Sequence, residues 1–510
     1  MNKARILFLS FLFAAMAAHH VPAQQLAGER TSVDLTVYNA NMALIREERT
    51  ISLIKGMNRV IVPEIPATID GTSLHFTSLS DPASVRILEQ NYQYDLVHHA
   101  KLMEKYIGKE VEFVRMDELT KKEFIVKAKL LATGWQQQPQ ASYNAYGQYV
   151  GTQAGYSYSG QMIAEVNGKV EVAPAGRLVL PSLAEGLILK PQLEWLVTTN
   201  REGQHKTEIS YMAGALNWNC NYVALLDKND SKLDLTGWVT LSNNSGTAFK
   251  NAGLKLVAGD VNLVKPDAAG FAMRASKMAL EADASAPQFQ QKELFEYKLY
   301  ALQRRTDLAN NETKQIELTS ARDVACKKAF IYDGMADNWR MYLNNYSYRM
   351  QESFGQQSNR KIGVFVTLKN EEKVGLGMPL PKGKVRVYKR DDDGKEQFIG
   401  EDQIDHTPKD EELKLYLGNA FDIVGERKQA SFKTIVSGHI IEESFEITLR
   451  NHKAEAVEVL VYEHPWRWSE WEIVKKNVEW TKIDQSTIKV RVRLKKDEEK
   501  TVSYTIRYMW

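Results

Sequence analysis

The sequence predicts a mainly β, multi-domain protein built from antiparallel β-sandwiches, with one short helix near residues 96–107. Apolar and polar residues alternate with a period of two at 33–38, 488–495 and 502–510, a pattern typical of strands buried on one face. The 510 residues are 44% hydrophobic and 25% charged, as in folded globular proteins. At about 150 residues per domain, we expect roughly two to four domains.

The N-terminus is typical of an export signal. Two positive charges precede an apolar run at 6–18, and Val21 and Ala23 occupy the small-residue positions of a cleavage site. This order predicts a signal peptide at 1–23 and a mature chain that starts at Gln24. No later stretch reaches the roughly 20 apolar residues that a membrane-spanning helix needs. We therefore expect an exported protein in the periplasm, at the outer membrane or on the cell surface, without a transmembrane helix.

Positive and negative side chains are nearly balanced, with 66 Lys and Arg against 64 Asp and Glu. Nucleic-acid-binding and polybasic membrane-surface proteins draw their affinity from excess positive charge. The composition therefore argues against nucleic acid as a partner.

The first β domain is expected at 24–114 and contains the helix. Asp95 can cap its first turn, Ala100 and Met103 recur at helical spacing, and Gly108 can end it. We expect this helix to pack on the first sheet as a plug.

A small β unit is expected at 115–191, with a Gln/Tyr-rich loop at 135–161 that carries no charged residue. The loop's composition fits either a Tyr-rich adhesive or sugar-stacking loop or a flexible excursion from a hairpin. Residues 192–510 predict a large β-sandwich region, which an Ala-rich linker at 266–287 interrupts.

Cys220 and Cys326 are the only cysteines. In an oxidising compartment the pair can close one long loop by a disulfide. Cys220 also shares one face of an expected strand with Trp218 and Tyr222, which suits a buried free thiol. The sequence leaves both possibilities open.

The acidic segment 401–412 supplies a candidate metal site. Glu401, Asp402 and Asp405 offer hard oxygen ligands on an expected loop, a donor set that suits Ca²⁺. Two nearby carboxylates also suit the acid and base of a glycosidase. The third interpretation is a solvated turn between strands.

Trp466, Trp468 and Trp471 form a candidate binding site together with Arg467. In a strand, Trp466 and Trp468 face the same side, where flat rings can stack on a sugar or clamp a peptide. Arg467 can add a directional hydrogen bond. Large aromatic residues also plug the ends of sandwiches, and the sequence leaves that structural role open.

The motifs that mark common enzyme classes are missing. The sequence contains no Gly-x-Ser-x-Gly elbow, no Walker loop, no complete Gly-x-Gly-x-x-Gly and no His-Glu-x-x-His. We therefore predict no catalytic residues and no cofactor, and we favour a protein without enzymatic activity.

Short strings over most of the chain resemble an exported family. They lie at 37–39 (VYN), 43–46 (ALIR), 89–92 (EQNY), 237–241 (GWVTL), 243–246 (NNSG), 256–261 (LVAGDV), 400–402 (GED), 406–408 (HTP), 418–422 (GNAFD) and 504–508 (YTIRY). In these strings the chain resembles the domain of unknown function 4139 family, which is related to mucoidy-inhibitor-like proteins. The resemblance implies an N-terminal β domain and a C-terminal β-sandwich region, and it implies no catalytic residues because the family has no established activity. Residues 116–204 lack the long helical hairpin of the mucoidy-inhibitor branch.

These observations favour a cell-envelope protein that binds or scaffolds an envelope protein or glycan. Two alternatives stay open. The first is a hydrolase of envelope polysaccharide or peptide, with the acidic segment 401–412 as its site. The second is an outer-membrane β-barrel, because Val502, Tyr504, Ile506 and Tyr508 alternate back from Trp510.

Overall fold

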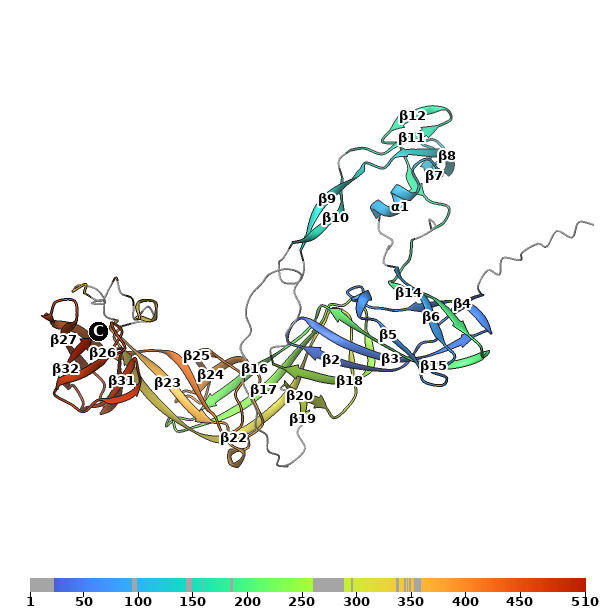
Figure 1. The fold of residues 1–510 in the computed structure, drawn as a ribbon. Coiled ribbons are helices and arrows are strands. Elements are labelled where there is room, and N and C mark those ends of the chain that lie inside the picture. Colours follow the sequence, from blue (N-terminus) through green and yellow to red (C-terminus); the bar gives the residue numbers. More distant parts are fainter. Residues whose placement is uncertain are drawn as a thin grey trace, which may run out of the picture.

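The computed structural model describes residues 23–93, 99–143, 149–158, 160–183, 187–259, 289–294, 297–335, 339–343, 345, 347, 350–352 and 359–510 (Figure 1). Except for Ala23, the expected signal peptide lies outside these residues, as does the expected linker at 266–287. The described chain is mainly β, which confirms the predicted fold class. Its one α-helix in these ranges, α1 (His99–Lys105), lies where the sequence predicts a helix. No helix of the described ranges has the length and apolar character needed to cross a membrane.

Two sheets form a sandwich near the start of the chain. The first has the order β1-β4-β14-β6, and the second has the order β19-β20-β18-β2-β3-β15-β5 with β21 beside β18. Strand β14 alternates buried and half-buried residues along its whole length, as expected where one face packs on a core. The elements are β1 (Ala23–Leu26), β2 (Arg30–Tyr38), β3 (Met42–Leu53), β4 (Gly56–Pro63), η1 (Gly71–Ser73), β5 (His75–Ser78), β6 (Arg86–Gln93), β14 (Gln192–Thr199), β15 (Gly203–Gly214), β18 (Phe249–Ala258), β19 (Phe289–Leu294), β20 (Tyr297–Leu302) and β21 (Thr306–Leu308).

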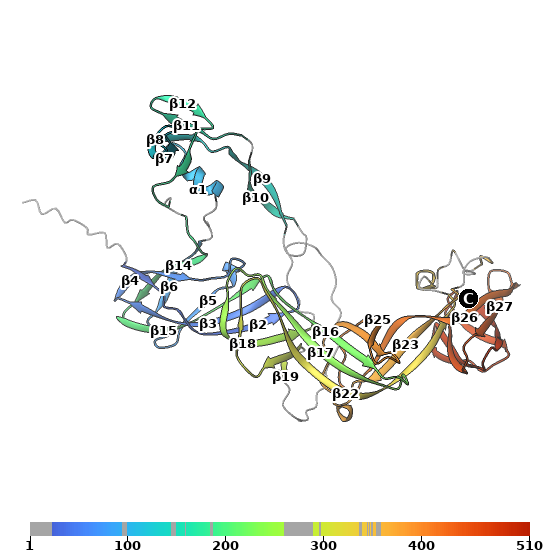
Figure 2. The same cartoon turned by 180° about the vertical axis from the view of Figure 1, so that it is seen from behind.

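The described residues between 99 and 187 belong to a separate unit, the inserted unit, which interrupts this N-terminal sandwich. The strands on either side of it, β6 and β14, pair with each other, and Gln93 lies opposite Gln192. The inserted unit has its own core around Met103 and Phe113, and both views show it standing away from the sandwich (Figures 1 and 2). Its sheet has the order β12-β11-β8-β7-β13, and β9 and β10 form a separate hairpin. The strands are β7 (Glu110–Met116), β8 (Glu123–Ala132), β9 (Trp135–Tyr143), β10 (Tyr149–Tyr158), β11 (Ile163–Val166), β12 (Lys169–Val172) and β13 (Arg177–Val179).

The inserted unit differs from the sequence-based expectations in two ways. Met103 of α1 is buried in the core of this unit, whereas we expected the helix to pack on the first sheet. The chain has already left that sheet after β6, so the helix meets the strands that follow it. The segment expected as a loop at 135–161 contains the hairpin β9–β10, in which Trp135 lies opposite Tyr158. Its uncharged, Tyr-containing composition is compatible with strands, because aromatic residues favour the extended backbone.

The remaining strands form one 13-stranded sheet with the order β25-β24-β16-β17-β22-β23-β26-β27-β32-β29, from which β28, β31 and β30 branch at β22. The elements are β16 (Leu216–Leu226), β17 (Lys232–Asn243), β22 (Glu312–Asp333), η2 (Trp339–Tyr342), β23 (Lys361–Lys369), η4 (Glu372–Val374), β24 (Gly383–Arg390), β25 (Glu396–Ile404), β26 (Glu412–Val436), β27 (Ile440–Asn451), β28 (Val457–Glu463), β29 (Trp471–Lys476), β30 (Thr481–Asp484), β31 (Thr487–Leu494) and β32 (Glu499–Met509).

Two hydrophobic cores lie along this sheet. The first is continuous with the core of the N-terminal sandwich and includes both Trp195 and Leu318. The second, the C-terminal core, includes Tyr332, Ile447 and Val459. The long strand β22 supplies Leu318 to one core and Tyr332 to the other. The two cores are therefore joined by continuous strands, and not by a linker, at this point of the fold.

Cys220 and Cys326 are both buried and neither is in a disulfide. Cys220 lies opposite Val239 of β17, whereas the amide of Cys326 bonds the carbonyl of Ser231. These contacts are eight residues apart along the chain, about 26 Å of extended strand, and a disulfide needs Cα atoms within about 7 Å. Burial raises the pKa of the Cys220 thiol to about 12. The structure therefore assigns Cys220 the role of a small apolar core residue.

Candidate functional site

A polar pocket lies where the N-terminal sandwich meets the 13-stranded sheet. Its volume is about 400 Å³. We call it the asparagine pocket, because four of its lining residues are asparagines; the lining includes Asn39, Asn217, Asn219, Asn221, Lys382, Lys384, Gln403 and His406.

Strand alternation explains why the asparagines gather on one face of β16. Trp218 and Cys220 point into the core with 2% and 1% of their surface exposed, so Asn217, Asn219 and Asn221 point to the opposite face. A polar residue at every second position is what a strand covered on one side requires.

Strands β24 and β25 extend this polar face sideways. Asn221 lies opposite Lys384 of β24, and Lys384 lies opposite Gln403 of β25. The parallel pairing of β16 with β24 brings the two backbones close together at Gly383, where a Cβ atom would lie 2.2 Å from the carbonyl oxygen of Cys220. Glycine at this position therefore lets the lysine-bearing strand approach the asparagines.

Both lysines of the asparagine pocket face a carboxylate. Lys384 Nζ lies 2.8 Å from Glu401 Oε1, and Lys382 Nζ lies 3.6 Å from Asp405 Oδ1. The hydrogen bond from Lys384, together with the charges of Lys384 and Arg386, lowers the pKa of Glu401. The carboxylates of Glu401 and Asp405 thus partly neutralise the two ammonium groups at the rim of the pocket.

Hydrogen bonds orient several of the remaining polar groups. His406 Nδ1 accepts from the backbone amide of Lys382 at 3.1 Å, so a neutral ring carries its proton on Nε2. Asn221 donates to Asn219 Oδ1 at 2.7 Å and to Thr240 Oγ1 at 3.1 Å. Asn217 Oδ1 is shielded from solvent and has no hydrogen-bond partner among the described residues. The pocket therefore combines preorganised amides with one shielded acceptor that has no partner among the described residues.

The candidate metal ligands do not converge. Glu401 and Asp402 are neighbours on β25, so their side chains point to opposite faces of the sheet. Asp402 accepts from the amide of Tyr416 at 2.7 Å, and the Asp405 side chain is 92% exposed beside Lys382. Among the residues that the structure describes, no group of three or more His, Cys, Asp or Glu side chains is placed to hold a metal ion. The first part of the expected loop, residues 401–404, is in fact the end of strand β25, which separates Glu401 from Asp402.

The candidate binding residues Trp466 and Arg467 are buried. They lie in the irregular segment between β28 and β29, not in a strand as expected, and their exposures are 2% and 0%. Arg467 Nη2 pairs with Glu443 Oε1 at 2.7 Å, and the Arg467 guanidinium lies 4.6 Å from the ring centroid of Trp466. This packing fits the structural role that the sequence left open.

Trp468 and Trp471 pack against the C-terminal core and keep part of their surface exposed. The indole nitrogen of Trp471 donates to the carbonyl of Gln485 at 2.7 Å, and Lys482 Nζ lies 4.4 Å from a Trp471 ring centroid. The four predicted binding residues therefore do not form one exposed surface.

A buried charged network lies beside Arg467 in the C-terminal core. Arg427 Nε donates to both oxygens of Glu463, at 3.0 and 2.8 Å, and the Tyr504 hydroxyl donates to Glu463 at 2.7 Å. The Arg427 guanidinium also lies 3.9 Å from the ring centroid of Phe445. Burial, reinforced by the charge of Glu463, raises the pKa of Tyr504 well above its usual value. These charges hold strands together inside a core and are not presented to a ligand.

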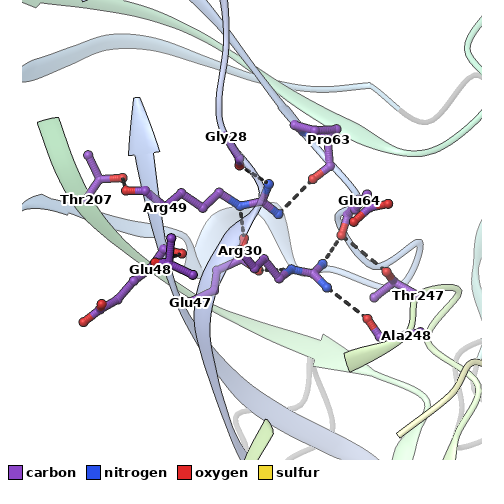
Figure 3. A network of polar contacts seen from close by, with 11 residues as sticks. Gly28, Arg30, Glu47, Glu48, Arg49, Pro63, Glu64, Thr207, Thr247 and Ala248 are labelled. Atoms are coloured by element: carbon purple, nitrogen blue, oxygen red, sulfur yellow. Dashed lines mark hydrogen bonds and ion pairs between the residues drawn. The ribbon is translucent and has the colours of Figure 1, made fainter. Parts of the chain in front are cut away.

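A second buried network of charged side chains links the two sheets of the N-terminal sandwich (Figure 3). Arg49 Nε donates to Glu47 Oε1 at 3.0 Å, and Arg30 forms an ion pair with the other Glu47 oxygen. Glu47 and Arg49 are 0% and 1% exposed. Both guanidinium groups also donate to backbone carbonyls. Arg49 donates to those of Gly28 and of Pro63 at the end of β4, and Arg30 donates to those of Glu64 and Ala248 in connecting segments. This network also has a structural role.

Sequence reasoning missed the asparagine pocket. The available signal is Asn217, Asn219 and Asn221 at alternate positions of one strand. The sequence does not reveal that β16 pairs with β24, because these two strands are more than 150 residues apart in the chain. No protein-family model matches this chain, and no curated protein matches it.

Proposed function

We propose that this chain is an exported cell-envelope protein that binds or scaffolds another envelope component. Export is the expectation that the N-terminal charges, apolar run and cleavage site create. The observation that carries the binding role is the asparagine pocket, in which amide, ammonium and imidazole groups from two parts of the fold face one cavity. Amides donate and accept hydrogen bonds but do not ionise near neutral pH, so the amide part of this lining suits binding better than bond cleavage.

The layout of the molecule supports a scaffolding role. The described residues form separate cores in the inserted unit and at the C-terminal end, in addition to the core of the N-terminal sandwich. The inserted unit and the C-terminal strands lie at separate places along the body (Figure 1). Such a chain offers several surfaces that a partner can contact independently.

Capture of partners from intact envelopes tests the binding role. We compare the full chain with a double variant in the asparagine pocket, Asn39→Ala/Asn219→Ala, and with the control Asn229→Ala in the turn that follows β16. We expect a specific protein or glycan to be retained by the wild type and by the control, and to be depleted for the double variant. Retention of no specific component by any of the three proteins contradicts the proposal.

Localisation and catalysis are tested separately. We expect the chain in the envelope fraction with Gln24 as its first residue, and an unprocessed chain in the cytoplasm contradicts export. Hydrolysis of envelope polysaccharide or peptide that disappears in Asp405→Ala/His406→Ala would identify a hydrolase instead.

A further inference from the structure

We infer that the asparagine pocket takes a neutral, hydroxyl-rich ligand, namely a saccharide unit, and not an anion. The inference rests on the proposed binding function and specifies its ligand.

The lining offers donors and acceptors side by side. Each Asn or Gln amide presents one oxygen that accepts and one NH₂ group that donates twice. Asn39, Asn219 and Gln403 bring such amides from three different elements to one cavity. A sugar hydroxyl both donates and accepts, so neighbouring hydroxyls match this alternation, whereas a phosphate or carboxylate group only accepts.

The charge balance disfavours an anion. Lys384 lies 2.8 Å from Glu401, and Lys382 lies 3.6 Å from Asp405. Arg386 also faces Glu401 at 3.4 Å. An anion would have to displace these carboxylates from their cations, whereas a neutral ligand leaves the ion pairs in place.

Asn219 carries the hydrogen-bonding capacity that the pocket offers to a ligand. Asn219 is exposed, and its side-chain oxygen accepts from the Asn221 amide, a bond that fixes the direction of its NH₂ group. A ligand hydroxyl can accept a hydrogen bond from this NH₂ group. Asn217 Oδ1 also lacks a partner in the described part of the chain, but it is shielded from solvent and is not an atom that a ligand contacts in this structure.

The dimensions fit one or two sugar rings. The pocket volume of about 400 Å³ falls within the roughly 300–1,000 Å³ of small-molecule sites. Successive asparagines on β16 are spaced by about 6.6 Å, so a ligand must present polar groups at several points along its length. Trp218 is buried in the core at 2% exposure and offers no stacking face, so hydrogen bonds dominate and we expect a Kd on the order of 1 mM.

The test is binding of the purified full chain to a broad array of neutral mono- and oligosaccharides, followed by titration of the best saccharide and of inorganic phosphate. Variants Asn39→Ala and Asn219→Ala come from different elements of the pocket and are compared with Asn229→Ala. All three positions are exposed, and thermal unfolding confirms that each variant is folded. We expect each pocket variant to weaken saccharide binding about tenfold and the control to bind like the wild type.

Three outcomes overturn the inference. These are binding of no saccharide on the array, saccharide binding that both pocket variants leave unchanged, and phosphate binding that competes at the same pocket. The proposed function fails instead when envelope capture retains no specific component. If capture retains a protein that depends on Asn39 and Asn219 while no saccharide binds, the proposed function stands and only the saccharide inference is lost.

Discussion

The carboxylate of Asp402 accepts a hydrogen bond from the backbone amide of Tyr416 at 2.7 Å. Asp402 lies on the edge strand β25 and Tyr416 lies on β26, which is not a ladder neighbour of β25. The two strands approach so closely that a Cβ atom at Gly400 would lie 2.7 Å from the carbonyl oxygen of Leu417. Asp402 therefore links the edge strand β25 to β26, which lies six strands further along the order of the same sheet.

Loss of the hydrogen bond between Asp402 and Tyr416 should destabilise the part of the sheet that contains β25 and β26. We expect Asp402→Ala to lower the free energy of unfolding by about 1–3 kcal/mol, because a hydrogen bond to a charged acceptor is lost. Urea unfolding at neutral pH measures the effect. Glu401→Ala is the matched control, since that exposed carboxylate pairs only with surface cations. An equal loss in both variants would contradict a special role for Asp402.

Asn243 should be essential for the turn that follows β17. Its side chain donates to the carbonyls of Thr247 and Ala309, both at 2.9 Å, and accepts from the amide and hydroxyl of Ser245. We expect Asn243→Ala to cost about 2–4 kcal/mol of unfolding free energy, because buried backbone groups lose their partners. The neighbouring Asn244 is exposed, and Asn244→Ala should change little in the same unfolding measurement.

Glu463 should be among the least replaceable residues of the C-terminal core. It receives both the Arg427 guanidinium and the Tyr504 hydroxyl, and it is 0% exposed. We expect Glu463→Gln to destabilise by about 3–5 kcal/mol, because the buried Arg427 charge is left uncompensated. Glu458 on the same strand pairs with Arg493 at the surface, and Glu458→Gln should cost less than about 1 kcal/mol. Thermal and urea unfolding compare the two variants.

Asp230 should make stability depend on pH. Burial by itself would raise the pKa of Asp230, but the hydrogen bonds and charges of Lys328 and Lys389 outweigh it and lower the pKa. The ion pairs therefore stabilise the fold above the unfolded-state value near about 3.9, and this contribution disappears as the pH falls through the lower folded-state value.

The matching experiment compares the wild type with Asp230→Asn in urea at several pH values. We expect the variant to be less stable by about 1 kcal/mol at pH near 7 and the difference to shrink below a pH of about 4. Asp392, which is fully exposed beside Lys228, provides the control Asp392→Asn. A difference that grows on acidification would contradict the direction of the pKa shift.

The inserted unit should be removable. Gln93 and Gln192 are directly opposite each other in the pair β6–β14, so a two-residue Asn-Gly turn can replace residues 94–191. We expect the shortened chain to keep its strand content by circular dichroism and to unfold cooperatively, because the core of the inserted unit is separate. Aggregation or loss of cooperativity would show that the N-terminal sandwich depends on the inserted unit.

Local patterns predicted the strand-rich fold class and the position of α1 well. The alternation at 502–510 is realised as Val502, Tyr504 and Ile506 in the C-terminal core. Such patterns are readable because the period of two depends only on which face of a strand is buried.

Which residues belong to which core or site could be decided only from the three-dimensional arrangement. Met103 has helical spacing in the sequence, but only the pairing of β6 with β14 assigns its helix to an inserted unit. Trp466 and Arg467 have the composition of a ligand-binding surface, yet Glu443 and Phe432 enclose Arg467. The same residue types serve a surface and a core, and burial depends on partners that are distant in the chain.

The sequence by itself determined that this protein is built from half-buried strands, with balanced charge and with asparagines at alternate positions of the segment that forms β16. The tertiary structure alone decided that those asparagines meet Lys384, Gln403 and Asn39 around one cavity, and that Asp402 binds the amide of Tyr416 on a strand far along the sheet. The physical reason is that periodicity reports the environment of each strand, whereas sites arise from pairings between strands whose register is set by packing across the whole sheet.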